Sequence, residues 1–110
     1  MLNQVIIVGR LVDAPKKVES ENGASKNIFT LACQRSYKNV DGTYDTDFFD
    51  ITTWGMVAEQ TTEYCKKGDV IGIRGRLQTR MVDDTKHTEI IAERVTFLSS
   101  NNITKDDSIE

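Results

Sequence analysis

The chain has 110 residues, with 14 Lys and Arg against 17 Asp and Glu, so its formal net charge at pH 7 is −3. This length fits one ordinary domain that a single hydrophobic core can stabilise without disulfides or metal. No run of about 18 apolar residues is present, which excludes a membrane-spanning helix, and the apolar segment 5–8 is too short for a signal peptide. We therefore expect a cytoplasmic protein.

The positions of the cysteines and charges argue against a disulfide or zinc site and leave room for a local basic face. Cys33 and Cys65 lie far apart in the sequence and are expected to be small apolar residues rather than a disulfide. One histidine, His87, cannot complete a zinc site, and no cofactor is predicted. Residues 101–110 hold one lysine and three acids, which leaves 13 Lys and Arg against 14 Asp and Glu in residues 1–100. Because that body is nearly neutral, it has room for a local basic face that binds a polyanion.

Alternating apolar residues predict three strands in the first half of the chain. They span residues 3–12, 26–37 and 47–54. A polar connection with the turn signal Asn22-Gly23 joins the first two strands, and a hairpin containing Asp41-Gly42 joins the second to the third.

The period then changes to that of a helix. Residues 56–67 predict about three helical turns with one apolar stripe. We expect Lys66 and Lys67 in the last turn, where cations are favoured, and Gly68 as the C-terminal cap.

Two more strands, over residues 69–82 and 87–98, follow the helix and are joined by a turn at Asp83-Asp84. Residues 101–110 are polar and are expected to form a disordered tail after a single domain of residues 1–100. The order of three strands, one helix and two strands predicts an all-β fold. It is that of a five-stranded Greek-key barrel with a helix between the third and fourth strands, the oligonucleotide/oligosaccharide-binding (OB) fold.

The fourth predicted strand carries a line of cations on one side, because successive side chains of a strand point to opposite faces. The residues expected toward the core are Ile71, Ile73, Leu77 and Met81. The residues expected outward are Arg74, Arg76, Gln78 and Arg80. For this strand alone, an ordinary solvated face that discourages strand pairing is an equally good interpretation.

The third predicted strand places large aromatic rings beside polar residues. The residues expected in the core are Phe49, Ile51 and Thr53, and those expected outside are Phe48, Asp50, Thr52 and Trp54. Three interpretations of the outer rings remain open: stacking on bases, an oligomer interface, or the core itself if the register is shifted by one residue. In the second strand the same alternation would turn Arg35 and Tyr37 inward. Burial of an unpaired arginine is costly, so the strand is expected to end or bulge before Arg35.

Together, the aromatic residues and the cations predict a binder of single-stranded nucleic acid. The expected stacking residues are Tyr37, Phe48 and Trp54. The expected phosphate contacts are Arg35, Lys38, Lys67, Arg74, Arg76 and Arg80. A cationic groove with ring faces for successive bases is how non-specific single-strand binders are built, and phosphate neutralisation makes their affinity salt-dependent. Duplex DNA hides its base faces, so this chemistry favours single strands.

No enzyme motif competes with this interpretation, because the sequence has neither a phosphate-binding P-loop nor a nucleophile elbow. Asp45, Asp47 and Asp50 lie close together in the sequence and are the only basis for an alternative as a metal-dependent nuclease. Carboxylates at the end of a loop are far more often solvated turn residues, so we predict a protein that is not an enzyme. The alternative function is an OB-fold assembly module of a primosome or recombination complex that binds mainly protein partners.

Four segments in order carry a resemblance to a known family: MLNQVIIVGRL, NIFTLACQRSY, DFFDITTWGMVAE and EYCKKGDVIGIRGRLQTR. Over about residues 1–100 the chain resembles the bacterial-type single-stranded DNA-binding protein (SSB) family. The resemblance implies a nucleoid-associated OB-fold protein that wraps single-stranded DNA in replication, recombination or repair. It implies a homotetramer, less often a dimer, with residues 3–8 in a strand-paired dimer interface. Family stacking positions fall on Tyr37, Phe48 and Trp54, and Arg80 matches a basic position.

The chain departs from the family pattern at two places. A fourth family aromatic, on the hairpin between the fourth and fifth strands, falls on Val82, which implies weaker or differently wrapped binding. Family members usually end in an acidic run closed by Pro-Phe, whereas this chain ends at Asp106-Asp107-Ser108-Ile109-Glu110. We therefore expect weak or absent recruitment of protein partners through the tail.

Overall fold

The computed structural model describes residues 1–19 and 23–99. The tail expected at residues 101–110 and Asn22 of the first predicted turn lie outside these described residues. The elements in chain order are β1 (Val5–Leu11), β2 (Lys16–Glu19), β3 (Ser25–Gln34), β4 (Thr46–Trp54), α1 (Gly55–Tyr64), β5 (Val70–Val82) and β6 (Thr85–Ser99).

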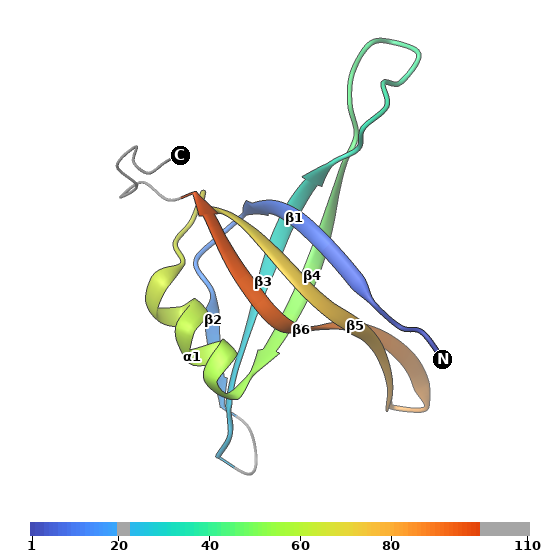
Figure 1. Cartoon of the computed structure of the whole chain (residues 1–110). Coiled ribbons are helices and arrows are strands. Elements are labelled where there is room, and N and C mark those ends of the chain that lie inside the picture. The colour runs from blue at the N-terminus through green and yellow to red at the C-terminus, as the bar shows by residue number, and fades with distance from the viewer. Residues whose placement is uncertain (20–22, 100–110) are drawn as a thin grey trace.

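The strands form one sheet that curls into a barrel. The strand order is β1-β5-β6-β4-β3-β2, and an additional pairing between β1 and β3 closes the barrel. All pairings are antiparallel except the short parallel contact between β4 and β6. The helix α1 lies between β4 and β5 in the chain and packs at one end of the barrel (Figure 1). This architecture confirms the predicted OB fold.

One strand was not expected. The segment that the sequence suggests as a polar connection contains β2, which pairs with Ser25–Ile28 of β3 at the free edge of the sheet. Its sequence, KKVE, has too few apolar residues to show the alternation of a buried strand. Lysines are common on edge strands because their charge discourages pairing with another chain.

The core is built from the inward residues of the barrel strands. Leu11, Leu31, Ile51, Ile71 and Ile73 are each at most 2% exposed, and further apolar residues pack around them. In β4 the alternation places Ile51 and Thr53 fully inside. Thr52, which was expected outside, is also buried, at 6% exposed, because it lies between Ile28 of β3 and Ile91 of β6. The apolar side chains predicted to face inward therefore do so wherever another strand or the helix covers them.

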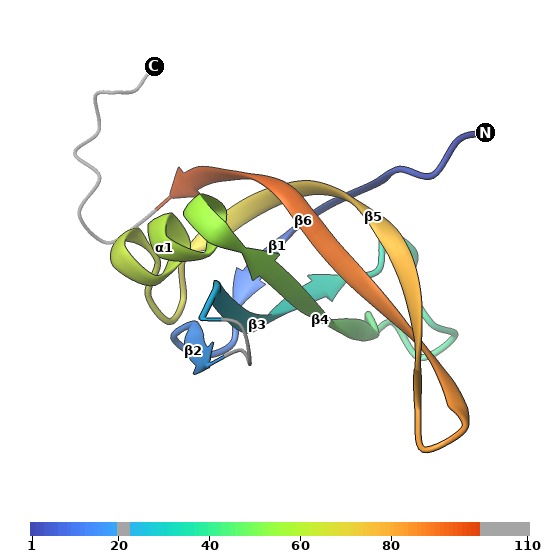
Figure 2. The same cartoon turned by 90° about the horizontal axis from the view of Figure 1, so that it is seen from below.

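The far half of β5 does not contribute to this core, contrary to the expectation for Leu77 and Met81. These side chains are 44% and 64% exposed. The reason is that β1 pairs with β5 no farther than Gly75, so beyond that point β5 has only β6 as a partner. The β5–β6 hairpin extends beyond the barrel, and Figure 2 shows it projecting away from α1.

A β-bulge between the barrel and this hairpin requires a glycine. Arg74 lies opposite Arg94 whereas Gly75 lies opposite Ala92, so Glu93 is an extra residue on β6. At this step the backbones approach so closely that a Cβ on Gly75 would lie 1.9 Å from the carbonyl oxygen of Ile91. Bulges of this kind bend a strand and increase its twist, and here the bulge marks where the hairpin leaves the barrel.

The helix is shorter than expected. It ends at Tyr64, and Cys65 is the C-cap, so Lys66 and Lys67 lie in the following loop rather than in the last helical turn. Gly68 does have a positive φ of 91°. It belongs, however, to a separate turn before β5, where its N–H donates to the carbonyl of Leu11 at 2.9 Å.

Asn27 of β3 ties α1 to the barrel. Its fully buried side chain donates to the carbonyl of Ala58 at 2.8 Å and to the hydroxyl of Thr61 at 2.6 Å. The Thr53 hydroxyl on β4 donates to the Asn27 side-chain oxygen. Because buried polar groups are costly when unsatisfied, this network fixes how the middle of α1 packs against β3 and β4.

Both cysteines are free thiols. Cys65 is buried, and burial raises its pKa to about 11. Cys33 is half-buried between β1 and β3, and burial followed by the nearby Asp47 carboxylate raises its pKa as well. Raised thiol pKa values make thiolate chemistry unfavourable, in agreement with their expected role as small apolar residues. Within the described ranges, no helix has the length and apolar character needed to span a membrane.

Candidate nucleic-acid interface

The outer face of β4 exposes two large rings. Phe48 is 64% exposed and Trp54 is 40% exposed, whereas Ile51 between them is fully buried. The β3–β4 register places Phe48 opposite Ala32, whose small side chain leaves the ring uncovered. This register excludes the alternative in which the two rings form the core.

Trp54 lies beneath a cation, Lys26, that is not among the predicted site residues. Lys26 of β3 is its direct cross-strand partner, and the Lys26 ammonium lies 4.9 Å from the centre of the tryptophan ring. Such cation–π contacts attract a positive charge to the face of the ring. Antiparallel pairing of the second and third predicted strands, with the start of one beside the end of the other, would have placed Lys26 next to Trp54.

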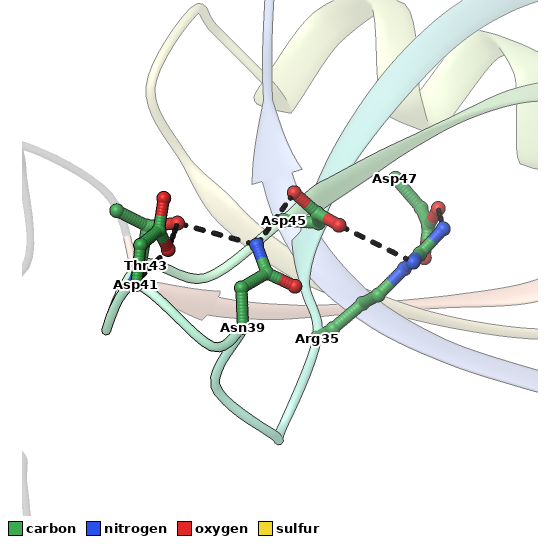
Figure 3. Close-up of polar contacts among 6 residues, drawn as sticks. All are labelled: Arg35, Asn39, Asp41, Thr43, Asp45 and Asp47. Atoms are coloured by element: carbon green, nitrogen blue, oxygen red, sulfur yellow. Dashed lines mark hydrogen bonds and ion pairs between the residues drawn. The ribbon is translucent and has the colours of Figure 1, made fainter.

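The second strand ends before Arg35, as expected. β3 stops at Gln34, and the Arg35 guanidinium donates to both carboxylate oxygens of Asp47, at 2.9 and 3.0 Å (Figure 3). A longer contact of 3.5 Å reaches Asp45. The hydrogen bond and charge of Asp47 raise the pKa of Arg35, and the guanidinium in turn lowers the pKa of Asp47. Arg35 therefore fastens the base of the β3–β4 hairpin.

The tip of this hairpin is also ordered by side chains. Asn39 donates to the hydroxyl of Thr43 at 3.2 Å and to Asp45 at 3.0 Å (Figure 3). The Asp41 carboxylate accepts from both the hydroxyl and the backbone N–H of Thr43, which lowers the Asp41 pKa. Tyr37, which is 64% exposed, is held on this hairpin.

The carboxylates behind the nuclease alternative have structural partners. Asp45 and Asp47 contact Arg35, and Asp50 accepts from the hydroxyl of Thr30 at 2.6 Å. No group of three or more His, Cys, Asp or Glu that could hold a metal ion exists within residues 1–19 and 23–99. The carboxylates near β4 thus act as hydrogen-bond acceptors of the hairpin and the sheet surface.

Arg76 and Arg80 of β5 lie on the same face of the sheet as the rings. Thr52 on the outer side of β4 pairs with Ile91 of β6, and Ile91 pairs with Arg76 of β5. Farther along the hairpin, Arg80 lines a hollow beside Asp50 of β4. The complete lining of this hollow is Ile28, Asp50, Thr52, Arg80, Val82, His87, Thr88 and Glu89. Val82, onto which the resemblance places a family aromatic, is half-buried and is part of this lining.

Two of these arginines are paired with carboxylates across the hairpin. The Arg80 Nε lies 2.6 Å from Glu89, and the Arg76 Nε lies 3.1 Å from Glu93. Neither glutamate is among the predicted site residues. Finding them needs the β5–β6 register, which the bulge shifts by one residue.

The remaining predicted cations lie in different places. Exposed Lys38 is on the β3–β4 hairpin with Tyr37. Arg74 lines a second hollow, on the β1–β5–β6 side of the barrel, with Arg94. Lys67 lies in the loop between α1 and β5, which Figure 1 shows at the end of the barrel opposite to the two hairpins. The structure thus places Arg76 and Arg80 on the sheet face that carries Phe48 and Trp54, and Lys38 beside Tyr37 on the β3–β4 hairpin. Arg74 and Lys67 lie elsewhere.

A small barrel with exposed rings and cations on one sheet face defines an OB-fold protein of the oligonucleotide-binding type. Residues 2–98 match the model of the Single-strand binding protein family. The chain belongs to that family.

Curated relatives agree with this family over most of the chain. Single-stranded DNA-binding protein B of Bacillus subtilis (strain 168) is 39% identical over 103 residues, which cover 89% of this chain and 91% of the relative. Single-stranded DNA-binding protein 2 of Staphylococcus aureus (strain COL) is 36% identical over 110 residues, with 96% and 79% covered. Single-stranded DNA-binding protein A of Bacillus subtilis is 40% identical, and there the chain covers 62% of the relative's length.

A solved structure agrees with the fold. The wild-type single-stranded DNA binding protein from Thermus aquaticus superposes with a TM-score of 0.78 at 24% sequence identity. The match covers 91% of this chain but 52% of that chain. At this identity the likeness shows a shared fold.

Proposed function

We propose that this protein binds and protects single-stranded DNA, without catalysis and largely without regard to sequence, in replication, recombination or repair. The supporting observation is the joint exposure of Phe48 and Trp54 on the sheet face that also carries Arg76 and Arg80. Family membership supports the same conclusion. The protein would act in the cytoplasm, at the nucleoid.

The mechanism divides between bases and phosphates. Bases stack on Tyr37, Phe48 and Trp54, and each stacked base contributes about 1–3 kcal/mol with little dependence on its identity. Phosphates are neutralised by the nearby cations, whose counterion release makes affinity fall with salt. Duplex DNA cannot offer its base faces to the rings, so it binds only through neutralisation of its phosphates.

The predicted phosphate contacts have different roles in this proposal. Arg76 and Arg80, on the sheet face of Phe48 and Trp54, and Lys38, next to Tyr37, would contact the backbone of a stacked strand. Arg74 and Lys67 are reached only by a strand that continues farther around the barrel. Arg35, which is already bound to two carboxylates, positions the hairpin that carries Tyr37.

We propose that the protein acts as a homo-oligomer, with a tetramer favoured over a dimer. Among residues 1–19 and 23–99, β1 pairs only with β5 from Val5 to Ile7, so its other edge is open there to a strand of a second copy. On the same strand Ile6 is 70% exposed and Val8 is 55% exposed. An unpaired edge beside exposed apolar side chains favours association, which a solution mass measurement tests.

The function is tested by titrating labelled oligo-dT and a duplex of equal length with the protein at several salt concentrations. We expect the single strand to bind far more tightly, and its affinity to fall as salt rises. Equal affinity for the duplex would contradict base stacking. Feeble binding of every nucleic acid, together with tight binding of a protein partner, would support the assembly module instead.

A further inference from the structure

Two arginines of β5, on the sheet face that carries Phe48 and Trp54, contact carboxylates of the neighbouring strand β6. The contact between Arg80 and Glu89 is 2.6 Å and that between Arg76 and Glu93 is 3.1 Å. The two glutamates differ in exposure: the side chain of Glu89 is 19% exposed and that of Glu93 is 54% exposed. The Glu89 carboxylate is therefore more shielded from water and salt than the Glu93 carboxylate, whereas Arg80 and Arg76 are 56% and 41% exposed.

Glu89 lies where a bound strand would run. It is the cross-strand partner of Gln78, and His87 is the partner of Arg80, so all four side chains lie on one face of the hairpin. Glu89 and Arg80 also line the hollow beside Asp50, on the outer face of the strand that carries both rings. A phosphate that approaches Arg80 meets the Glu89 carboxylate at the same guanidinium.

We propose that Glu89 is an internal competitor of the DNA phosphates. Its carboxylate forms an ion pair with the Arg80 guanidinium in the free protein. This ion pair must break when a DNA phosphate binds Arg80. Glu89 therefore lowers both the affinity for single-stranded DNA and its dependence on salt. The proposal rests on the proposed function, because it assumes that a nucleic-acid strand occupies this face.

The effect on salt dependence follows from the charge of the pair. An arginine and a glutamate in contact have no net charge, so they hold no condensed anion and add little to the counterions released on binding. Each unpaired cation that neutralises a phosphate of a single strand steepens the slope of log affinity against log salt by about 0.7. Glu89 should therefore lower the steepness of this slope by the contribution of one cation, and the more solvated Glu93 should lower it by less.

The test compares Glu89→Gln with the wild type in oligo-dT titrations over a range of salt concentrations. Glutamine has nearly the same volume and keeps an acceptor for Arg80, so the hairpin should remain folded, which circular dichroism checks. We expect about two- to fivefold tighter binding at low salt and a slope steeper by about 0.7.

Asp84→Asn is the matched control, because it makes the same change of charge on the same hairpin. Asp84 lies in the β5–β6 turn with φ at 64°, a conformation that asparagine tolerates. Within the described part of the chain it makes no ion pair. We expect less than half of the gain seen for Glu89→Gln.

The proposal is overturned if Glu89→Gln binds no more tightly than the wild type, or if Asp84→Asn gains as much. Should Glu89→Gln prove unstable, Glu93→Gln decides the question: a smaller gain in the same direction supports competition, and no gain contradicts it. Wild-type protein that binds oligo-dT at low salt while neither glutamine variant gains affinity leaves the proposed function standing and rejects only this inference. Wild-type protein that binds no oligo-dT rejects both.

Discussion

The ammonium of Lys26 lies 4.9 Å from the centre of the Trp54 ring, directly across the β3–β4 ladder. The lysine occupies one face of the ring and leaves the rest of a side chain that is 40% exposed open to solvent. In the proposed function, a base would stack on the open part of the ring, and the Lys26 ammonium would then be available to a phosphate of the bound strand.

We predict that Lys26→Gln weakens oligo-dT binding several-fold at low salt and reduces the salt slope by about 0.7, the loss of one phosphate contact. Salt-dependent anisotropy titrations measure both quantities. Lys66→Gln, in the α1–β5 loop, is the control and should bind like the wild type. An unchanged slope for Lys26→Gln would mean that the lysine only covers the ring.

Phe48 and Phe49 are adjacent in sequence but should have opposite roles. We predict that Phe48→Ala lowers oligo-dT affinity by about 5- to 150-fold, the equivalent of about 1–3 kcal/mol of lost stacking. Because Phe48 is 64% exposed, its removal should leave the melting temperature unchanged. Phe49 packs against the core, so Phe49→Ala should destabilise the fold by about 3 kcal/mol. Equal destabilisation by both variants would place Phe48 in the core instead.

The fold was predictable because apolar and polar residues alternate along each barrel strand, which indicates the strand and its buried side. In β4, a single pattern separates Ile51 inside from Phe48 and Trp54 outside, and the structure has that register. Alternation predicts which side of the sheet a side chain lies on, but not whether other elements cover that side. It placed Leu77 with the core, although the hairpin carrying it has left the barrel.

The rest of the site depends on contacts between distant segments. Lys26 over Trp54, and Glu89 on Arg80, arise only when two strands are set in register. The β6 bulge at Glu93 changes that register without a sequence signal other than a glycine on the opposite strand. The two lysines after α1 fitted a last helical turn, but the helix ends before them.

Gly75 should be indispensable at the bulge. A Cβ there would lie 1.9 Å from the carbonyl oxygen and 2.8 Å from the carbonyl carbon of Ile91, and backbone atoms cannot move aside as a side chain can. We predict that Gly75→Ala lowers the melting temperature by more than about 10 °C, from at least about 3 kcal/mol of strain. Gly72→Ala is the comparison, because its Cβ would meet Val8 at 3.4 Å and Leu98 at 3.6 Å, and a shift of a few degrees at most is expected. Similar melting temperatures for the two variants would contradict the close approach.

The Arg35–Asp47 pair should make a pH-dependent contribution. Arg35 lowers the pKa of Asp47 below its ordinary value of 3.8. A carboxyl whose pKa is lower in the folded state stabilises the fold above the unfolded pKa, and this stabilisation is lost as pH falls through the folded value. We predict that Arg35→Gln returns the Asp47 pKa toward 3.8, as followed by NMR of the carboxyl carbon.

Asp41 supplies the internal control for that titration. Its pKa is lowered by hydrogen bonds from Thr43 and not by Arg35. It should stay low in the Arg35→Gln variant. A rise of both pKa values would indicate that the whole hairpin has come apart, and no rise of either would show that Arg35 does not hold Asp47 in solution.

Stacking on Trp54 is the central claim, and the fluorescence of this residue tests it most directly, because it is the only tryptophan of the chain. Oligo-dT added at low salt should quench the emission, and added salt should restore it as the strand dissociates. If anisotropy shows that the oligonucleotide is bound while Trp54 emission stays constant, no base lies on the ring, and the proposed interface is wrong.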